Sequence, residues 1–184
     1  MIDLTGDVLA VAERLLGCRV LTAFGDEPTV VMLTEVEAYR GDQDPASHAF
    51  RGMTDRNRSM FAPPGTLYVY RSYGLHWCMN VVTAEEGVAH AVLLRGGVAT
   101  EGQAVMARRR GRPDHIADGP GKLCQALAVT GAVDGSSLDD GPVRLIAGTL
   151  PSGSTVERTP RIGISKAIDR PWRFVARLRD LPTP

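Results

Sequence analysis

The spacing of hydrophobic positions changes several times along the chain, and each change predicts a structural element. Between residues 7 and 17 apolar side chains recur every three or four positions, which is typical of an amphipathic helix closed by a glycine. Residues 19–24 and 29–39 are instead rich in β-branched residues and are separated by the turn sequence GDEP. The sequence therefore begins with a predicted helix followed by two strands.

The middle of the chain predicts a long irregular segment and then a hairpin. Residues 40–65 are rich in Gly, Pro, Asp and Asn and lack periodicity, and such segments are usually functional or disordered. Residues 66–82 contain two β-rich runs around the sequence RSYG, which predicts a hairpin with Tyr73 at or beside its tip. Residues 89–97, AHAVLLRGG, predict a further strand.

The second half predicts two helices and three short strands. Residues 100–111 open with a capping box of Thr100 and Gln103 and close at a glycine. Residues 118–131 predict another helix, with Asp118 as its N-cap. The strands are predicted at VRLIAG (143–148), RIGIS (161–165) and WRFVAR (172–177). Strands outnumber helices, so we expect a mixed α/β (α+β) fold, with residues 1–184 forming a single domain.

Composition limits the size and the compartment of the protein. A chain of 184 residues with an ordinary apolar fraction is long enough for one domain with a proper core. The first residues show no basic segment followed by an apolar one, and no apolar run approaches the roughly 18 residues of a membrane helix. Three widely spaced cysteines indicate reduced thiols of a cytoplasmic protein: Cys18, Cys78 and Cys124.

The formal net charge is zero, but the charge is unevenly distributed. Between Arg51 and Arg112, nine arginines stand against four acidic residues, a net of +5. The rest of the chain carries 12 basic and 17 acidic residues, a net of −5. The planar guanidinium group suits phosphate oxygens and base edges. This excess is compatible with a polyanionic partner and equally with a solvated, arginine-rich surface.

A carboxylate pair is the first candidate for chemistry. The period of two in residues 29–39 places Glu35, Glu37 and Tyr39 on one face of the strand, where it runs into the irregular segment. A carboxylate at this position could accept a proton from water and orient the water for attack. The spacing alone does not choose between Glu35 and Glu37, and a surface glutamate on an edge strand explains the same pattern.

All four tyrosines lie in one part of the sequence: Tyr39, Tyr68, Tyr70 and Tyr73. Their position beside the arginine-rich block indicates a stacking surface for planar ligands such as bases. We expect stacking for Tyr39 and Tyr70, and core packing for Tyr68. An exposed aromatic ring at a hairpin tip has nothing to bury against, so Tyr73 suits a wedge between base pairs.

The histidines and the sequence GPGKL give weaker signals. His48 could be a hydrogen-bonded core residue or a ligand-facing one, and His76, His90 and His115 show no metal-ligand spacing. GPGKL lacks the spacing of a phosphate loop, although its backbone N–H groups could meet a phosphate at a helix start. We expect Lys122 to make a charge contact rather than to act as an amine nucleophile.

Taken in order, these motifs resemble the alkyladenine (3-methyladenine) DNA glycosylase family, and in particular its compact bacterial members. The resemblance rests on the sequences EVEAYRGDQDPASHAFRGMTDRNRSMFAPPGTLYVYRSYGLHWCMNVV, AVLLRGG and DGPGKLCQAL. It covers roughly residues 8–127 and continues weakly through RIGIS and PWRFVAR. It implies a single mixed α/β domain around a curved antiparallel sheet, with a protruding β-hairpin that enters the minor groove of damaged double-stranded DNA.

The resemblance also implies an activity. Members hydrolyse the N-glycosidic bond of alkylated or deaminated purines (the class of 3-methyladenine, 7-methylguanine, hypoxanthine and ethenoadenine) without a metal or cofactor. Glu37 is implied to activate the water, which chooses it over Glu35, and Arg95 is implied to lie near that water and the DNA backbone. We expect a monomer that acts on DNA, with no membrane partner.

Further roles follow from the matched motifs. The resemblance implies that Tyr39, His48 and Tyr70 sandwich the flipped base. Tyr73 is implied to intercalate, and Asn80 to crowd the 2-amino group of guanine. We also expect basic and glycine residues to contact the DNA backbone: Arg51, Arg56, Arg58, Arg108, Gly119, Gly121 and Lys122.

Some residues depart from the family pattern. Arg40 stands where some members carry an apolar residue, His76 and Trp77 vary the second strand of the hairpin, and residues 128–160 follow no matching motif. These differences leave the lesion preference and the affinity for DNA open. Three other functions use the same residues: a non-catalytic nucleic-acid-binding module, a glycosylase–lyase with Lys122 as nucleophile, and a hydrolase of free nucleosides.

Overall fold

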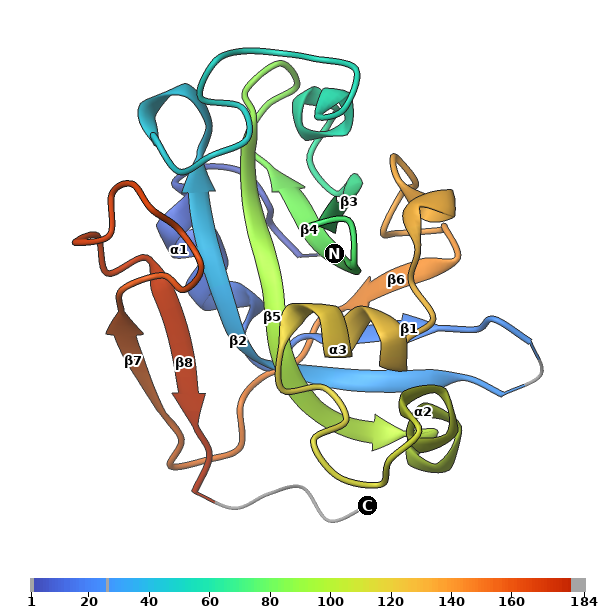
Figure 1. The fold of residues 1–184 in the computed structure, drawn as a ribbon. Coiled ribbons are helices and arrows are strands. Elements are labelled where there is room, and N and C mark those ends of the chain that lie inside the picture. The colour runs from blue at the N-terminus through green and yellow to red at the C-terminus, as the bar shows by residue number, and fades with distance from the viewer. Residues whose placement is uncertain (1, 26, 180–184) are drawn as a thin grey trace.

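The computed structural model describes residues 2–25 and 27–179 as a curved antiparallel sheet flanked by short helices (Figure 1). The strands are β1 (Arg19–Thr22), β2 (Thr29–Arg40), β3 (Leu67–Ser72), β4 (His76–Thr83), β5 (His90–Glu101), β6 (Val143–Ile146), β7 (Thr155–Thr159) and β8 (Arg173–Arg177). The α-helices are α1 (Val8–Leu15), α2 (Gln103–Arg110) and α3 (Pro120–Ala126). Single 3₁₀ turns are formed by η1 (Gly41–Gln43), η2 (Arg58–Phe61) and η3 (Gly131–Val133).

The long strands β2 and β5 run side by side through the middle of the molecule (Figure 1). The strand order is β3-β4-β5-β2-β1-β6, and β8 pairs with both β2 and β7. All of these pairings are antiparallel. The register between β2 and β5 shifts on both sides of Glu35, and such irregularities bend a strand and increase its twist. The sheet therefore curves at the point where the two candidate glutamates lie.

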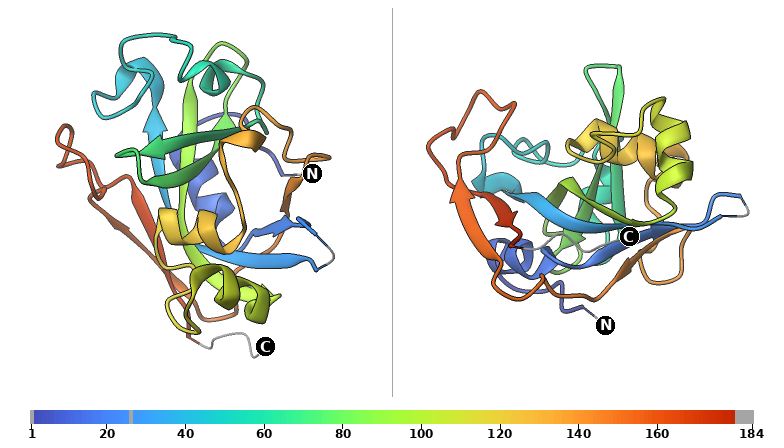
Figure 2. Two further views of the ribbon diagram at one scale, coloured as in Figure 1. Left: turned by 45° about the vertical axis from the view of Figure 1, so that its right-hand side comes forward. Right: turned by 90° about the horizontal axis from the view of Figure 1, so that it is seen from below.

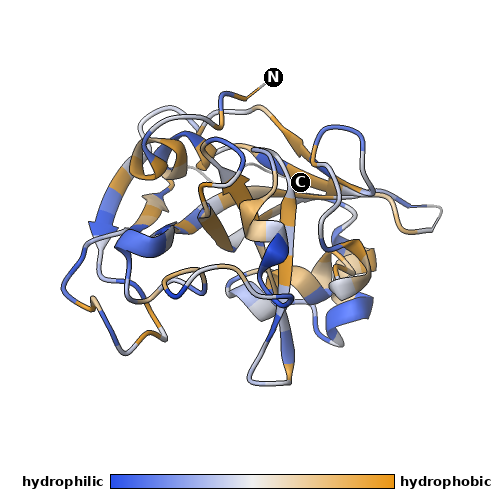
Figure 3. Ribbon diagram, turned by 90° about the horizontal axis from the view of Figure 1, so that it is seen from above, coloured by the Kyte–Doolittle hydropathy of each residue, from blue (hydrophilic) through white to orange (hydrophobic). Residues whose placement is uncertain are grey.

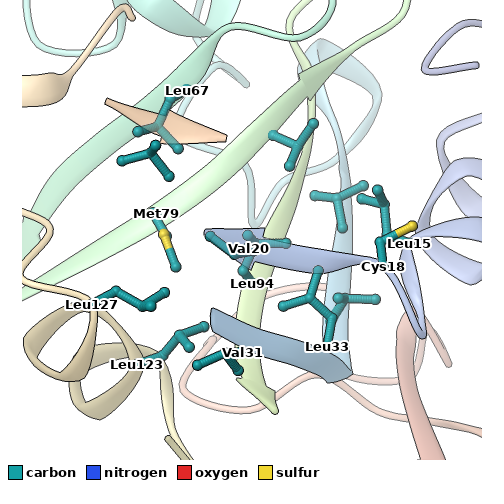
Figure 4. Close-up of a cluster of buried hydrophobic side chains, with 14 of the residues drawn as sticks. Leu15, Cys18, Val20, Val31, Leu33, Leu67, Met79, Leu94, Leu123 and Leu127 are labelled. Atoms are coloured by element: carbon teal, nitrogen blue, oxygen red, sulfur yellow. The ribbon is translucent and has the colours of Figure 1, made fainter. Parts of the chain in front are cut away.

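The period of two in β3, β4 and β5 separates the two faces of the sheet. One face belongs to the main core, which gathers apolar side chains from α1, α3 and the central strands; Figure 4 shows Leu15, Leu33, Met79 and Leu94 among them. The opposite face carries a smaller cluster of Ala49, Met60, Tyr68, Val82, Ala89 and Ala91 beneath the irregular segment. In Figure 3 the strands at the centre are largely hydrophobic, whereas the surrounding loops mix hydrophilic and hydrophobic residues.

Most elements predicted from periodicity are confirmed. The first helix, the first two strands, the hairpin and the strand around residues 89–97 occur where expected, although β5 runs on to Glu101. The apolar stripe of the first helix is buried at Val8, Val11, Ala12 and Leu15. Strands β6 and β8 lie within the predicted ranges 143–148 and 172–177, and residues 40–65 are irregular apart from two 3₁₀ turns.

Both predicted helix caps are wrong. Thr100 belongs to β5 and its hydroxyl donates to the carbonyl of Val30, so the helix begins only at Gln103, behind Gly102. Asp118 is replaced as N-cap by Gly119, because the Asp118 carboxylate bonds the side chains of His115 and Lys122 instead. The helix predicted at residues 118–131 also ends early, at Ala126.

The strand predicted at RIGIS is also wrong. Residues 161–165 form an irregular loop, since Arg161 and the backbone N–H of Ile162 bond the side chains of Asp44 and Glu37 instead of joining a strand ladder, and Gly163 has a φ of 76°. The strand β7 was not predicted, because its side chains are mostly polar and exposed. It pairs only with β8 and so lies at the edge of the sheet.

Two further observations concern the described residues. The three cysteines are buried and unpaired, as their spacing predicted. Among residues 2–25 and 27–179, no helix combines the length and the apolar character needed to cross a membrane.

Candidate active site

A cavity of about 550 Å³ opens on the face of the sheet that is turned away from the main core. Its floor consists of strand residues from β2, β3, β4 and β5. Its walls come from two loops, residues 45–48 and 162–166, and its rim includes the tip of the β3–β4 hairpin. This volume lies within the range of about 300–1,000 Å³ that small-molecule sites occupy.

Strand register explains why distant residues meet on this floor. Glu37 pairs with Leu93, Leu93 with Asn80, and Asn80 with Tyr68, so one row crosses β2, β5, β4 and β3. The next row contains Tyr39, paired with Ala91. Because cross-strand partners point to the same face, the sheet presents one carboxylate, one amide and two tyrosines side by side.

The carboxylate of Glu37 is completely enclosed, with a relative exposure of 0%. Its Oε2 accepts a hydrogen bond of 2.9 Å from the hydroxyl of Tyr39. Its Oε1 accepts one of 2.8 Å from the backbone N–H of Ile162 and lies 3.3 Å from Nη1 of Arg95. Tyr39, Arg95 and Ile162 all line the cavity, so they form the layer between Glu37 and the open space.

Glu35 lies on the same side but has a different environment. Its Oε1 accepts hydrogen bonds from Nε of Arg95 (2.8 Å) and Nε of Arg173 (2.7 Å). Burial alone would raise the pKa of Glu35, but the hydrogen bonds from Arg173 and Arg95 outweigh burial and lower that pKa. Arg95 therefore lines the cavity and bridges the two glutamates, whereas Tyr39 and Ile162, which also line the cavity, bond Glu37 and not Glu35.

Aromatic rings form one side of the cavity. The rings of His48 and Tyr70 meet edge to face with centroids 4.5 Å apart, and Tyr68 stacks on Tyr70 at 5.6 Å. The side chains of His48 and Tyr68 are joined by a 3.0 Å hydrogen bond at Nδ1. Tyr68 is buried in the smaller cluster, as expected, while Tyr39 and Tyr70 are partly exposed.

Protonation states in this wall are set by burial and by neighbouring charges. Burial, followed by the charge and hydrogen bond of Glu37, raises the pKa of Tyr39. Burial also raises the pKa of Tyr70. Burial and, to a smaller extent, the charge of Arg56 lower the pKa of His48. At neutral pH the wall therefore presents uncharged rings.

Two small side chains complete the floor. Asn80 donates a 3.1 Å hydrogen bond from Nδ2 to the carbonyl of Tyr68, which fixes the orientation of its amide at the cavity. Cys78, opposite Tyr70 in the ladder, also lines the cavity, and burial raises the pKa of its thiol. Nothing in the spacing of the sequence distinguished Cys78 from the other core cysteines.

Tyr73 projects from the hairpin tip. Its side chain is 87% exposed although it is aromatic, and its φ of 49° is unusual for a residue other than glycine. A single residue in this left-handed region costs roughly 1–2 kcal/mol. In the right-hand view of Figure 2 the green β3–β4 hairpin extends beyond the rest of the molecule. The fold therefore holds an exposed ring, at some cost, beside the mouth of the cavity.

The residues expected to contact a DNA backbone are dispersed. Arg56 lines the cavity, while Arg51 and Arg58 lie on the exposed part of the loop beside it. Arg108 lies on α2, at the far end of β5 in Figure 1, and contacts Glu27 at 3.7 Å. The remaining three lie at the start of α3: Gly119, Gly121 and Lys122. Their contacts with DNA remain predictions.

A close contact with the hairpin explains why residue 121 is a glycine. A Cβ atom at this position would lie 2.9 Å from Cβ of His76, the first residue of β4. The start of α3 thus packs directly against the hairpin and supports it. Lys122 is paired with Asp118 at 3.0 Å and does not line the cavity.

The structure adds residues that the sequence analysis missed. Arg161 and Asp44 form a buried ion pair beneath the cavity walls, and Arg173 holds Glu35. Asn57 is buried and donates from Nδ2 to the carbonyls of His48 (2.9 Å) and Gly52 (3.0 Å). The partners of Arg161 and Arg173 lie 117 and 138 residues away in sequence, so no local pattern could reveal them.

The described residues include no group of three or more His, Cys, Asp or Glu side chains arranged to hold a metal ion. The groups that the protein itself presents at the cavity are an enclosed carboxylate, a bridging arginine and aromatic rings.

Comparison with known proteins agrees with this geometry. Residues 3–179 match the family model described as methylpurine-DNA glycosylase (MPG). A protein of Rhodopseudomonas palustris (strain BisB18), named "Putative 3-methyladenine DNA glycosylase", is 51% identical over 166 residues, which cover 89% of this chain and 80% of the relative. Relatives with the same name in Frankia casuarinae and Methanoculleus marisnigri are 49% and 47% identical, over 91% of this chain and 83% and 89% of their own lengths. This chain belongs to the methylpurine-DNA glycosylase family.

Proposed function

We propose that this protein is a DNA glycosylase that extrudes an alkylated or deaminated purine from duplex DNA and hydrolyses its N-glycosidic bond. The observation that carries the proposal is the enclosed carboxylate of Glu37 directly behind an aromatic-lined cavity. Family membership and the name shared by the relatives support the same reaction, with 3-methyladenine as the first substrate to test.

The base must leave the helix before it can enter the cavity. Extrusion costs a few kcal/mol, and less for damaged pairs, which biases it towards lesions. Tyr73 fills the vacated stack and slows the return of the base. The flipped purine then stacks between Tyr39 on one side and His48 with Tyr70 on the other. A cationic base such as 3-methyladenine is attracted to the tyrosine faces by roughly 0.5–2 kcal/mol each.

Hydrolysis is assigned to Glu37 and one water molecule. The bond between C1′ and the base nitrogen breaks with its electron pair leaving on the base, and the sugar passes through an oxocarbenium-like state. The water oxygen bonds to C1′ and its proton passes to Glu37. Among the described residues Oε1 has two partners, whereas Oε2 has the Tyr39 hydroxyl alone and so retains acceptor capacity for the water, which has to enter the layer that encloses Glu37.

The surrounding groups define the role of the carboxylate further. Arg95 and the N–H of Ile162 hold Oε1 of Glu37 in place, and a carboxylate charge at this position stabilises the positive charge that develops on the sugar. A pure binding module gains nothing from an enclosed carboxylate facing a polyanion. Lys122, paired with Asp118 outside the cavity, is not positioned as the nucleophile of a lyase.

The test is an excision assay on duplex oligonucleotides that each carry one lesion. Glu37→Gln is expected to reduce the single-turnover rate of excision by about 10²–10⁴-fold, the usual contribution of a general base. Its binding to DNA with an abasic-site analogue is expected to persist. Glu35→Gln, one step along the same face, serves as the matched control with a smaller loss. Excision by Glu37→Gln at the wild-type rate would exclude the mechanism. Binding without excision of any lesion by the wild type would favour the non-catalytic module.

A further inference from the structure

We propose that the buried ion pair of Arg161 and Asp44 is a positioning pair, which holds both loop walls of the cavity and the contact between Ile162 and Glu37 in their working geometry. The proposal rests on the glycosylase function proposed above and extends it to residues that touch neither base nor sugar.

The pair is completely enclosed. The side chains of Arg161 and Asp44 are both 0% exposed. Nη1 and Nη2 of Arg161 each donate to one oxygen of the Asp44 carboxylate, the second at 2.8 Å, in a forked arrangement. Nη1 also donates to the carbonyl of Ala38 at 3.0 Å. Asp44 in turn accepts the backbone N–H of Ala46 at 3.2 Å.

One guanidinium therefore joins three parts of the site. Ala38 lies on β2 between Glu37 and Tyr39, and the guanidinium also packs over the Tyr39 ring, 4.6 Å from its centroid. Asp44 begins the wall that leads through residues 45–47 to His48. Arg161 begins the other wall, and the next residue places its N–H on Glu37.

Stability alone does not account for this arrangement. Two buried charges lose their hydration, and well-packed apolar side chains of similar volume are often at least as stable. The pair instead provides hydrogen bonds of fixed orientation, because the donors of a planar guanidinium point in set directions and an apolar contact has no such preference. These contacts fix the Tyr39 ring, which stacks on the base, and the segment whose Ile162 N–H holds the catalytic carboxylate.

The chain offers a matched control in Arg170. This residue lies in the same loop, comes within 4.0 Å of Asp44, packs over Trp172 and donates to the carbonyl of Gln43. It contacts neither Ala38 nor Glu37. Arg161→Lys and Arg170→Lys remove the planar fork at two positions around one carboxylate, and only the first of these belongs to the proposed pair.

Three measurements distinguish positioning from folding. For Arg161→Lys we expect single-turnover excision to slow by about 10–100-fold, the usual effect of losing the support of a functional side chain. The Kd for DNA with an abasic-site analogue is expected to remain that of the wild type. Amide hydrogen exchange at Ile162 is expected to accelerate, because its hydrogen bond to Glu37 is no longer held. Arg170→Lys is expected to match the wild type in all three.

A second variant covers the case in which Arg161→Lys folds poorly. Asp44→Asn combined with Arg161→Gln leaves no uncompensated buried charge, so it is expected to fold while excision stays slow and the Ile162 amide exchanges rapidly. Wild-type excision with a protected Ile162 amide in either variant would overturn the proposal. If the wild type excises no lesion, the proposed function fails, but the exchange of the Ile162 amide still tests the positioning pair.

Discussion

The hydroxyl of Tyr39 donates a 2.9 Å hydrogen bond to Oε2 of Glu37, and within residues 2–25 and 27–179 it is the one partner of that oxygen. Both residues lie on β2, two positions apart, so the strand itself fixes their separation. The ring of Tyr39 lines the cavity, and its hydroxyl orients the carboxylate behind the cavity. Under the proposed function, a base that contacts the Tyr39 ring would therefore act on the residue that also orients the Glu37 carboxylate.

Tyr39→Phe isolates this hydrogen bond from the stacking surface. The ring remains, but the carboxylate loses one donor, and hydrogen bonds to charged groups contribute about 1.5–3 kcal/mol. We expect single-turnover excision to slow by roughly tenfold or more, with DNA binding unchanged. Tyr70→Phe is the control, because its ring also lines the cavity while its hydroxyl lies by Cys78 rather than a carboxylate. Equal losses in both variants would show that the Tyr39–Glu37 bond has no special role.

Tyr73→Ala tests the hairpin wedge. Because its side chain is 87% exposed, the free energy of unfolding is expected to change by less than about 0.5 kcal/mol. Excision from duplex DNA is expected to fall most for lesions that pair well, since these cost most to extrude. Tyr73→Phe should retain activity. A comparable loss on single-stranded substrate would contradict a role in extrusion, because no stack has to be opened there.

Asn57→Ala tests the loop that carries His48. The buried amide donates hydrogen bonds to two carbonyls and accepts hydrogen bonds from the backbone N–H and the hydroxyl of Thr54. Its loss therefore leaves several polar groups without partners. We expect the free energy of unfolding to fall by about 2 kcal/mol in urea titrations. The neighbouring, exposed Arg58 provides the control, and Arg58→Ala should change it by no more than about 0.5 kcal/mol.

Glu35→Gln tests the electrostatic support of Arg95 through its pH dependence. The pKa of Glu35 in the folded protein is lowered from 4.5, so its stabilisation is present above 4.5 and is lost as the pH falls through the lowered value. The difference in free energy of unfolding between wild type and variant should therefore be constant near neutral pH and shrink in acid. A difference that grows on acidification would have the wrong sign for this ion pair.

The floor of the cavity could be predicted because it follows from a local rule. The period of two in β2 put Glu37 and Tyr39 on one face, and the β-rich runs around RSYG placed Tyr73 at the hairpin tip. Once strands pair in register, these faces form the floor of the cavity without further information. The family resemblance then distinguished Glu37 from Glu35, which the spacing had left equivalent.

The loop walls could not be predicted, since their geometry depends on partners far away in sequence. RIGIS has the alternation of a strand, yet Arg161 is drawn to Asp44 and Ile162 to Glu37, so neither joins the sheet. The capping box failed for a related reason, because β5 extends through Thr100 by pairing with β2. In each case a long-range contact overrides a valid local preference.

The contact between Ile162 and Glu37 spans 125 residues, and that between Arg173 and Glu35 spans 138. During translation the carboxylates therefore leave the ribosome before the segment that encloses them, and a domain folds as a unit. A nascent chain interrupted before Arg161 would carry β2 and the β3–β4 hairpin but only one of the two loop walls of the cavity. Under the proposed function, the order of synthesis therefore delays a complete excision site until this last segment has emerged.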